Sequence, residues 1–336
     1  MDSQLYPLLF EPIFRQSNRR AQGFAPWIAE LMSNCNLAPP AENDIDECWL
    51  LADSKDIQST VANGRLAGVT LRSLVAERPL EMVGRHHASR SAFPLMARVF
   101  ATAEEQPLLV HPDSDAGSER WEKHGNMKIW YSLAVQGDAR AYVGIDPRVS
   151  AQQLFANINS PQARQFLQKL KIRPGDSCLI PPGMVHSLST GHLIWELKPR
   201  PAPPLCLGPG REQDRIPAKE QEMARDSVKL ESRQSTRTAR VRSPLTHTRK
   251  ISLTRHWPYF SVEELRIADH ISLETAGVAC HLLYPTVGRC LIRYRQGQEF
   301  VLPLGRICCV PAILGKYQLV AEAPSEILRA THQVIG

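Results

Sequence analysis

The apolar residues of the chain are grouped mostly in short runs separated by proline, glycine and polar turns, a pattern typical of β-strands. Such runs lie at 47–51, 93–101, 107–113, 128–135, 139–145, 178–180 and 191–197, and they recur from Ile251 onwards. The 26 prolines and 19 glycines indicate many turns between them. The sequence therefore predicts a mainly β protein.

Helical spacing of apolar residues is restricted to a few segments. It predicts helices over 24–32, 71–83 and 217–228. A longer helix is predicted over 150–170, where one apolar stripe is formed by Leu154, Phe155, Ile158, Phe166 and Leu170. Helices are thus a minor part of the expected fold.

The stretch from Pro174 to His186, P-G-D-S-C-L-I-P-P-G-M-V-H, carries the most specific local pattern. A Gly–Asp turn precedes a short strand, and a Pro-Pro-Gly corner then places His186 at the start of the next strand. The spacing of Gly175, Pro181, Gly183 and His186 resembles the second conserved motif of cupins, which are double-stranded β-helices of the jelly-roll type. That resemblance implies a small β-barrel with an imidazole inside its mouth.

A chain of 336 residues is long enough for two domains. After Glu196 the sequence changes to K-P-R-P-A-P-P-L-C-L-G-P-G, which cannot sustain a strand ladder because proline lacks a backbone donor. Residues 301–312 repeat the apolar-Gly-polar-apolar-Pro pattern of the Pro174 stretch, without a histidine after Pro311. We expect an N-terminal cupin barrel with the candidate active site over 1–200, a Pro-rich, helical and basic linker over 201–250, and a smaller cupin-like barrel over 251–336.

Charge and cysteine usage limit the class of protein further. The net charge of +6 is small, and much of the excess lies in the basic run 233–250, which we interpret as a solvated linker; we expect no nucleic-acid partner. The N-terminus does not have the pattern of an export signal, and no apolar run approaches the roughly 20 residues that span a bilayer. The eight cysteines include no C-x-x-C pair, which indicates reduced thiols in a cytoplasmic protein.

Several further segments, in the right order, resemble the short bacterial form of the type I mannose-6-phosphate isomerase (phosphomannose isomerase) family. They are E-C-W at 47–49, S-T-V-A-N-G at 59–64, F-P-L at 93–95, V-H-P-D at 110–113, W-Y at 130–131, K-I-R-P-G-D through His186, and Y-F-S-V at 259–262. The resemblance implies two cupin barrels and a zinc cofactor. It also implies interconversion of mannose 6-phosphate and fructose 6-phosphate, with a hexose 6-phosphate as the ligand.

The metal ligands implied by this resemblance are only half retained. The family's zinc is held by a glutamine and a histidine two residues apart, a glutamate on a neighbouring strand, and a histidine after the Pro-x-Gly corner. The two histidines correspond to His111 and His186, whereas Leu109 stands at the glutamine position and Lys128 at the glutamate position. Leucine has no donor atom and lysine is normally a cation, so this zinc site is expected to be impaired. Glu196 and Asp113 are the candidates to restore it.

The candidate catalytic residues are Arg98, Lys128 and Glu196. Arg98 replaces a family lysine and keeps its charge, but a guanidinium cannot easily serve as a base. The Lys128 ammonium could stand in for the ion by neutralising the oxyanion of an enediolate, the intermediate of aldose–ketose isomerisation. Strand parity places His192 on the same face as Glu196, where the two could form a pair. The family's arginine-containing S-D-x-T-Y-R and its N-terminal W-G-G are absent from this sequence.

Three functional hypotheses follow. The first is a mannose-6-phosphate isomerase-like protein, an intramolecular aldose–ketose isomerase by family, with impaired activity. The second is a non-catalytic cupin, or pseudoenzyme, that binds sugar phosphates or another protein. The third is a different metallo-cupin such as an oxygenase, which has only two obvious ligands. The sequence does not decide the oligomeric state.

Overall fold

The computed structural model describes residues 4–16, 45–85, 87, 92–112, 127–160, 162–199, 204–210, 215–230, 237–240, 244–254, 257 and 259–333. Within these ranges the chain forms four antiparallel sheets of seven, five, six and four strands. The prediction of a mainly β fold is confirmed. The helix expected over 24–32 lies outside the described residues.

Two of the sheets are built largely from the N-terminal part of the chain. The seven-stranded sheet has, in spatial order, β13 (Arg237–Thr238), β9 (Ser177–Ile180), β6 (Lys128–Val135), β11 (His192–Pro199), β4 (Leu95–Ala101), β3 (Ile45–Leu51) and β2 (Ile13–Gln16). The five-stranded sheet has β12 (Leu205–Gly208), β5 (Leu108–Val110), β10 (His186–Leu188), β7 (Ala141–Ile145) and β8 (Leu167–Leu170).

The other two sheets are built largely from the C-terminal part. The six-stranded sheet has β1 (Leu8–Leu9), β20 (Cys308–Val310), β17 (His281–Val287), β22 (Ser325–His332), β15 (Phe260–Ile267) and β14 (Arg249–Ser252). The four-stranded sheet has β16 (His270–Glu274), β21 (Lys316–Ala321), β18 (Cys290–Tyr294) and β19 (Gln298–Leu302).

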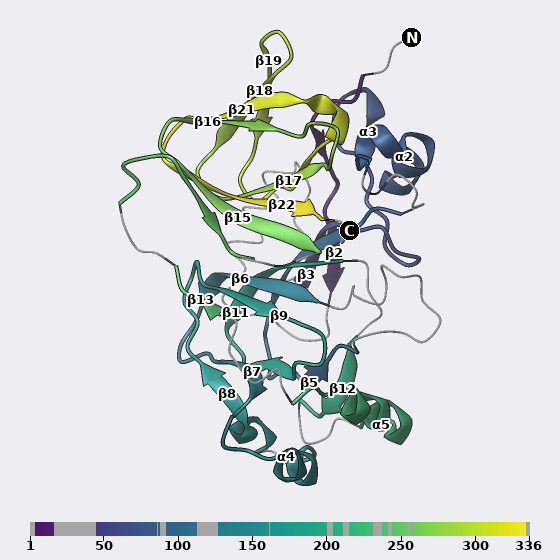
Figure 1. Ribbon diagram of the computed structural model, residues 1–336, viewed down its shortest axis with the longest axis vertical. Helices are drawn as coiled ribbons and strands as arrows, with labels where there is room; N and C mark the ends of the chain where they lie inside the picture. Colours follow the sequence, from purple (N-terminus) through teal and green to yellow (C-terminus); the bar gives the residue numbers. More distant parts are fainter. Residues whose placement is uncertain are drawn as a thin grey trace.

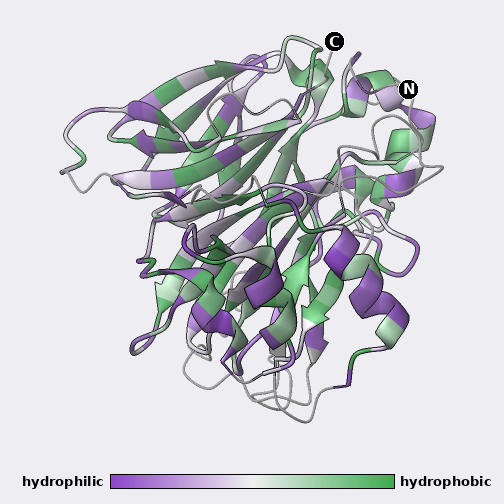
Figure 2. Cartoon of the chain, turned by 60° about the horizontal axis from the view of Figure 1, so that its bottom comes forward, coloured by the Kyte–Doolittle hydropathy of each residue, from purple (hydrophilic) through white to green (hydrophobic). Residues whose placement is uncertain are grey.

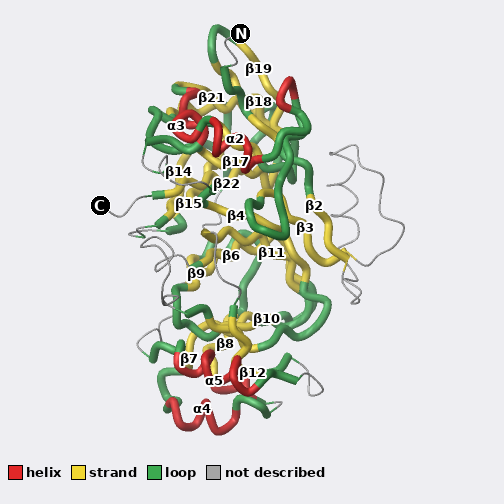
Figure 3. Tube along the Cα trace, turned by 90° about the vertical axis from the view of Figure 1, so that its right-hand side faces the viewer, coloured by secondary structure: helices red, strands yellow, loops and turns green. Residues whose placement is uncertain are grey.

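The four sheets lie as successive layers along the long axis of the molecule (Figures 1 and 3). The five- and seven-stranded sheets enclose one core, which includes Trp130, Val143 and Ile194. The six- and four-stranded sheets enclose a second core, which includes Leu283 and Leu319. A third, larger core joins the seven-stranded sheet to the six-stranded sheet, so that the two halves are packed together through apolar side chains.

Short helices cover the outer parts of these layers. They are α2 (Leu71–Glu77), α3 (Pro79–Met82), α4 (Ala151–Asn157) and α5 (Ala218–Asp226), with 3-10 turns η1 (Gly64–Leu66), η3 (Ala163–Phe166) and η4 (Ala312–Leu314). In Figure 3, α2 and α3 lie beside the upper sheets and α4 and α5 lie at the far lower end. The helix expected over 217–228 is confirmed as α5.

Two helix predictions need correction. The segment 71–83 is not one helix, because Arg78 leaves helical geometry at φ −136° and ψ 53° before Pro79, which starts α3. The segment 150–170 is helical only at its start, where Ser150 and Gln153 form a capping box. Its last four residues form β8 and pair with β7. Pro161 lies between the helix and the strand in the sequence, and its missing donor disfavours a continuous helix.

Side chains alternate between the two faces of the central strands, and this alternation positions the site. On β11, Trp195 and Leu197 belong to the core shared with the six-stranded sheet, whereas Ile194 belongs to the N-terminal core. Glu196 therefore points into the N-terminal barrel. Figure 2 shows the same banding, with apolar and polar residues alternating along many strands.

Pairing between distant segments links the expected parts of the chain. β1 near the N-terminus pairs with β20, opposite Cys308 and Cys309. In the segment expected to be a linker, β12 pairs with β5 and β13 pairs with β9, so both add strands to the N-terminal sheets. The division of the chain at residues 200 and 250 stays a prediction. Strands β12 and β13 come from the predicted linker and extend the N-terminal sheets.

The structure also bears on the membrane and cysteine predictions. None of the helices in the described ranges has the length and apolarity needed to cross a bilayer. Seven of the eight cysteines lie in described ranges, and all seven are free thiols; Cys35 lies outside them.

Candidate functional site

A cavity of about 150 Å³ opens inside the N-terminal barrel, between its two sheets. The seven-stranded sheet contributes Arg98 from β4, Lys128 from β6 and Glu196 from β11 to the lining. The five-stranded sheet contributes Leu109 from β5 and His186 from β10, which lie directly opposite each other in register. Five of the residues that the sequence singled out therefore line one cavity.

Glu196 is the centre of the polar network in this cavity. It is buried, with 1 % of its surface exposed, and lies opposite Arg98 on one side and Trp130 on the other. Its Oε1 accepts a hydrogen bond from Arg98 Nε at 2.8 Å, and its Oε2 accepts one from Trp130 Nε1 at 2.9 Å. Both oxygens are thus fixed by donors from the neighbouring strands.

Lys128 completes the network as a buried cation. Its Nζ lies 3.3 Å from Glu196 Oε2 and 5.1 Å from the centre of the Trp130 ring. Only 4 % of the lysine is exposed, so the ammonium is paired with a carboxylate and an aromatic face and not with water. The prediction that Lys128 points into this cavity with Glu196 as its partner is confirmed.

Arg98 connects the buried network to the barrel rim. Its Nη1 donates to Glu47 Oε1 at 3.2 Å, while its guanidinium lies 4.7 Å from the Phe100 ring and 5.3 Å from the Trp49 ring. Two carboxylates and two aromatic faces thus hold one guanidinium. The bidentate fork of arginine suits this task better than the point charge of a lysine.

The two predicted metal ligands, His111 and His186, are brought together. Their rings are nearly parallel, with centroids 5.5 Å apart and an interplanar angle of 11°, and both are buried. His186 Nδ1 lies 2.9 Å from the carbonyl oxygen of Met184, which can only accept, so Nδ1 carries the proton and Nε2 has a free lone pair. His186 Nε2 and both nitrogens of His111 are buried without a hydrogen-bond partner in the described chain.

The charge states of these groups follow from burial and mutual attraction. Burial raises the pKa of Glu196, but Arg98, Lys128 and Lys198 outweigh it and hold that pKa well below its usual range. Burial lowers the pKa of Lys128, an effect that Glu196 partly offsets. Burial, and then the Lys128 ammonium, keep the pKa values of both histidines well below 6.5. At neutral pH we therefore assign a carboxylate, an ammonium and two neutral imidazoles.

The donor set was compared with the zinc site that the family resemblance implies. The orphaned nitrogens of His111 and His186 are suitable donors, but Leu109 offers none and Lys128 places a positive charge where an anionic ligand would stand. Glu196 is already occupied by two cations and an indole. No three His, Cys, Asp or Glu side chains of the described chain form a group suited to a metal. These residues do not fit a zinc ion.

Other site predictions have mixed outcomes. His192 lies on the same strand as Glu196, but no hydrogen bond in the described ranges joins the two, and the neighbouring polar group of His192 is the backbone of Arg140. Asp113 lies outside the described residues. The sequence reading missed Trp130 and Glu47, although Trp130 has the strand parity of Lys128 and Glu47 belongs to the E-C-W segment.

Sequence comparison identifies relatives with a consistent name, although no family model matches the chain. Bacillus subtilis YvyI, named provisionally as a mannose-6-phosphate isomerase, is 34% identical over 151 residues, covering 45% of this chain and 46% of that protein. Mannose-6-phosphate isomerase ManA of the same organism is 27% identical over 191 residues, which is 56% of each chain. The aligned segments thus span about half the length of these relatives.

Solved structures resemble the chain over almost its whole length. The mannose 6-phosphate isomerase from Bacillus subtilis aligns with a TM-score of 0.73 at 21% identity, covering 97% of this chain and 99% of that one. The apo form of the enzyme from Salmonella typhimurium aligns with a TM-score of 0.73 at 14% identity, covering 98% and 100%. The resemblance is confirmed: about half of the chain is similar in sequence to proteins named as mannose-6-phosphate isomerases, and almost the whole chain has the β fold of the solved ones.

Proposed function

We propose that the N-terminal barrel binds a hexose 6-phosphate or a similar sugar phosphate, and that its mannose-6-phosphate isomerase activity is strongly impaired. The relatives named as isomerases support the ligand class. The contact between Lys128 Nζ and Glu196 Oε2 at 3.3 Å is the single observation that supports the proposed loss of activity. An internal ion pair lies at the position where the family resemblance implies a metal ligand.

The chemical step needs a group that removes a carbon-bound proton next to a carbonyl. General bases work best when their pKa lies near the operating pH. Glu196, His111 and His186 all have pKa values well below their usual ranges, so each is a weak base at neutral pH. Arg98 is a permanent cation. The cavity therefore holds charges suited to binding, and none of these four side chains is well suited to act as the base.

The balance of charge around the cavity favours an anionic or oxygen-rich ligand. Three cations, Arg98, Lys128 and Lys198, act on Glu196, and Glu47 supplies the second carboxylate. One positive charge is therefore left unbalanced in a site with little access to water. The cavity volume of about 150 Å³ is below the 300–1,000 Å³ typical of small-molecule sites. We therefore expect a ligand to be only partly enclosed and to bind weakly.

The proposal is tested by assaying conversion of mannose 6-phosphate to fructose 6-phosphate with added zinc, cobalt or manganese, together with calorimetric titration of mannose 6-phosphate. We expect negligible turnover and saturable binding in the millimolar to micromolar range, with ΔG of roughly −4 to −8 kcal/mol. Lys128→Met should weaken binding, whereas the control Lys219→Met on exposed helix α5 should not. Turnover on the order of 1–1,000 per second would contradict the proposal.

Of the two forms of the non-catalytic alternative, sugar-phosphate binding and protein interaction, the second differs from the proposal in one measurable respect. If the barrel serves only as a protein-interaction module, neither mannose 6-phosphate nor fructose 6-phosphate should bind. A cytoplasmic location remains part of the proposal, supported by the seven free thiols among the described residues.

A further inference from the structure

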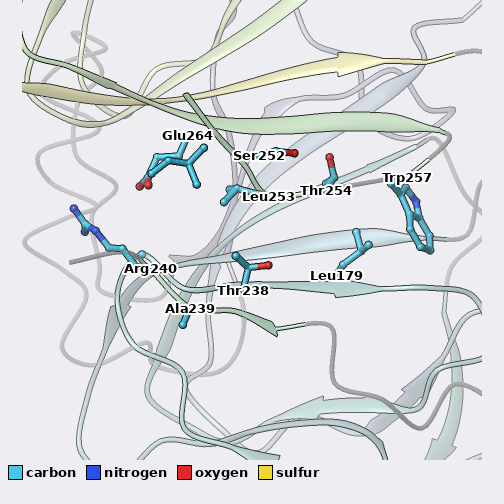
Figure 4. A pocket seen from close by; sticks show the side chains of 11 residues that line it. Leu179, Thr238, Ala239, Arg240, Ser252, Leu253, Thr254, Trp257 and Glu264 are labelled. Carbon is cyan, nitrogen blue, oxygen red and sulfur yellow. The ribbon is translucent and has the colours of Figure 1, made fainter. Parts of the chain in front are cut away.

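A second and larger cavity, of about 480 Å³, lies between the two halves of the molecule (Figure 4). Its volume falls within the range typical of small-molecule sites, and interfaces between domains are a common place for such sites. One wall comes from β9 and β13, with Leu179 and Thr238, and the other from β14 and the segment after it, with Ser252 and Leu253. Strands from both halves and from the basic segment therefore build this cavity together.

The ends of the cavity differ in chemistry. Figure 4 shows Trp257 at one end and Arg240 with Glu264 at the other. Trp257 is half-buried and lies against Tyr259, with ring centroids 6.4 Å apart. Its indole gives this end a flat apolar surface, of the kind on which the C–H face of a sugar ring can pack.

Hydroxyl groups line the middle of the cavity. The backbones of Thr238 and Ser252 belong to strand ladders, but their side-chain hydroxyls have no hydrogen-bond partner in the part of the chain that the structure describes. Thr254 Oγ1 accepts from the Val262 amide at 2.8 Å, which leaves its own proton available. The hydroxyls of Thr238 and Ser252 on the cavity wall are thus the two that no described residue occupies.

The polar end is rigidly built. Arg240 donates through Nη2 to Glu326 at 2.7 Å, and its amide donates to Asp176 Oδ1 at 2.9 Å. Gly175 has φ +90°, and a Cβ there would lie 2.1 Å from Arg240 Cδ, so the glycine makes room for the arginine side chain. This close approach fixes the guanidinium at the cavity wall.

Glu264 supplies a buried carboxyl group at the same end. Only 2 % of the residue is exposed, and its Oε1 accepts from Tyr131 Oη at 2.8 Å. Burial, together with the nearby Glu326, raises the pKa of Glu264 despite the tyrosine bond. The second carboxyl oxygen can accept from a ligand hydroxyl.

The local charges decide the class of ligand. Arg237 pairs with Asp176, and both Arg240 and Arg266 pair with Glu326, while Glu264 adds the third carboxyl. Three guanidinium groups are therefore balanced by three carboxyl groups, in contrast to the positive cavity of the N-terminal barrel. A site with hydroxyl donors, one carboxyl acceptor and an aromatic wall matches a neutral polyol, and these described ion pairs leave no net charge for an anion.

We propose that this cavity between the barrels is a second ligand site, which binds a neutral sugar in its pyranose form. The sugar ring packs on Trp257, and its hydroxyls exchange hydrogen bonds with Thr238, Ser252 and Glu264. This site shares no lining residue with the cavity of the N-terminal barrel, so the two are separate. Its ligand also differs, because it carries neither a phosphate nor a free carbonyl group.

Ligand-observed NMR titration of the intact protein tests this with three probes: methyl α-mannopyranoside, methyl α-glucopyranoside and methyl β-galactopyranoside. These glycosides cannot open to an aldehyde, so they cannot report isomerase chemistry. At least one should bind saturably in the millimolar range. Trp257→Leu should weaken that binding by about tenfold or more, as expected for loss of an aromatic anchor.

Folding effects are separated by a milder variant and two controls. Thr238→Val with Ser252→Ala removes two hydroxyl groups with little change in side-chain size, and it should also weaken binding at least about threefold because the ligand loses their hydrogen bonds. His186→Phe in the first cavity and Lys219→Glu on α5 should leave the affinity unchanged. The proposal is overturned if none of the three glycosides binds saturably, or if binding is equal in the wild type and both cavity variants. Loss of binding in His186→Phe alone would also overturn it.

Discussion

Lys128 on β6 and Glu196 on β11 form an ion pair inside the N-terminal barrel, with Nζ and Oε2 3.3 Å apart and both side chains almost completely buried. The two strands are neighbours in the seven-stranded sheet, so the pair is fixed by the backbone ladder. The family resemblance implies an anionic metal ligand at the lysine position. In our proposal, the Lys128 ammonium takes the place of that metal ion as the partner of a carboxylate.

Removing the charge of Glu196 should destabilise the protein strongly. Glu196→Gln leaves Lys128 and Arg98 as buried cations with one fewer carboxylate, a change that typically costs about 3–5 kcal/mol in a buried pair. The control is Glu47→Gln, which contacts the same Arg98 but is 22% exposed and should cost less than about 1 kcal/mol. Urea unfolding of both variants measures the difference. Equal losses of unfolding free energy in the two variants would show that the burial of Glu196 does not strengthen its contribution to stability.

Acid should destabilise the native state through its buried histidines. Burial lowers the pKa of His192 to about 4 and that of His281 to about 3, whereas unfolded histidine titrates near 6.5. Between these values the unfolded chain binds protons that the native chain does not, so stability is full above pH 6.5 and falls as the pH drops towards 4. For His192 the loss is on the order of 3 kcal/mol.

Urea unfolding at several values between pH 7.5 and pH 4 checks this slope. His281→Asn should flatten it, while the exposed His270→Asn should leave it unchanged. A stability that is constant over this range would mean that the imidazoles are not held neutral in the native state.

Two glycines with the same backbone angle separate strain from close packing. Gly84 has φ +87° and a Cβ there would lie 2.2 Å from the carbonyl oxygen of Val278, whereas Gly68 has φ +88° with nothing within 4 Å. Gly68→Ala should cost about 1–2 kcal/mol for the left-handed backbone. Gly84→Ala should cost a further 1 to 3 kcal/mol, roughly, because the backbone must move. Thermal unfolding compares them, and equal melting temperatures would contradict the predicted close contact.

Much of the fold and of the polar network could be predicted from local patterns. The Pro174 stretch placed His186 inside the mouth of the barrel, and parity along 191–197 placed His192 on the same face as Glu196. That parity rests on a period of two residues, which any strand enforces. Lys128 was singled out by the family resemblance, which places a metal-ligating glutamate at its position.

Other features depend on contacts between distant segments. The pairing of Leu8 with Cys309 joins residues about 300 positions apart, and two-residue strands have no periodicity to detect. The strand at 167–170 was predicted as helix because its apolar residues continue the stripe of the preceding helix. The cavity beside Trp257 and Glu264 combines four separate segments, and nothing in the motif around Pro174, which supplies one of them, indicates that the other three lie beside it.

The metal affinity of the N-terminal barrel tests the central claim most directly. Zinc is titrated calorimetrically into the wild type and into the double variant Leu109→Gln with Lys128→Glu, which supplies an oxygen donor and replaces a repulsive charge by an attractive one. We predict that the double variant binds zinc at least about tenfold more tightly than the wild type, a difference of about 1.4 kcal/mol or more. Tight binding of one zinc per wild-type chain, abolished by His186→Ala, would contradict the account.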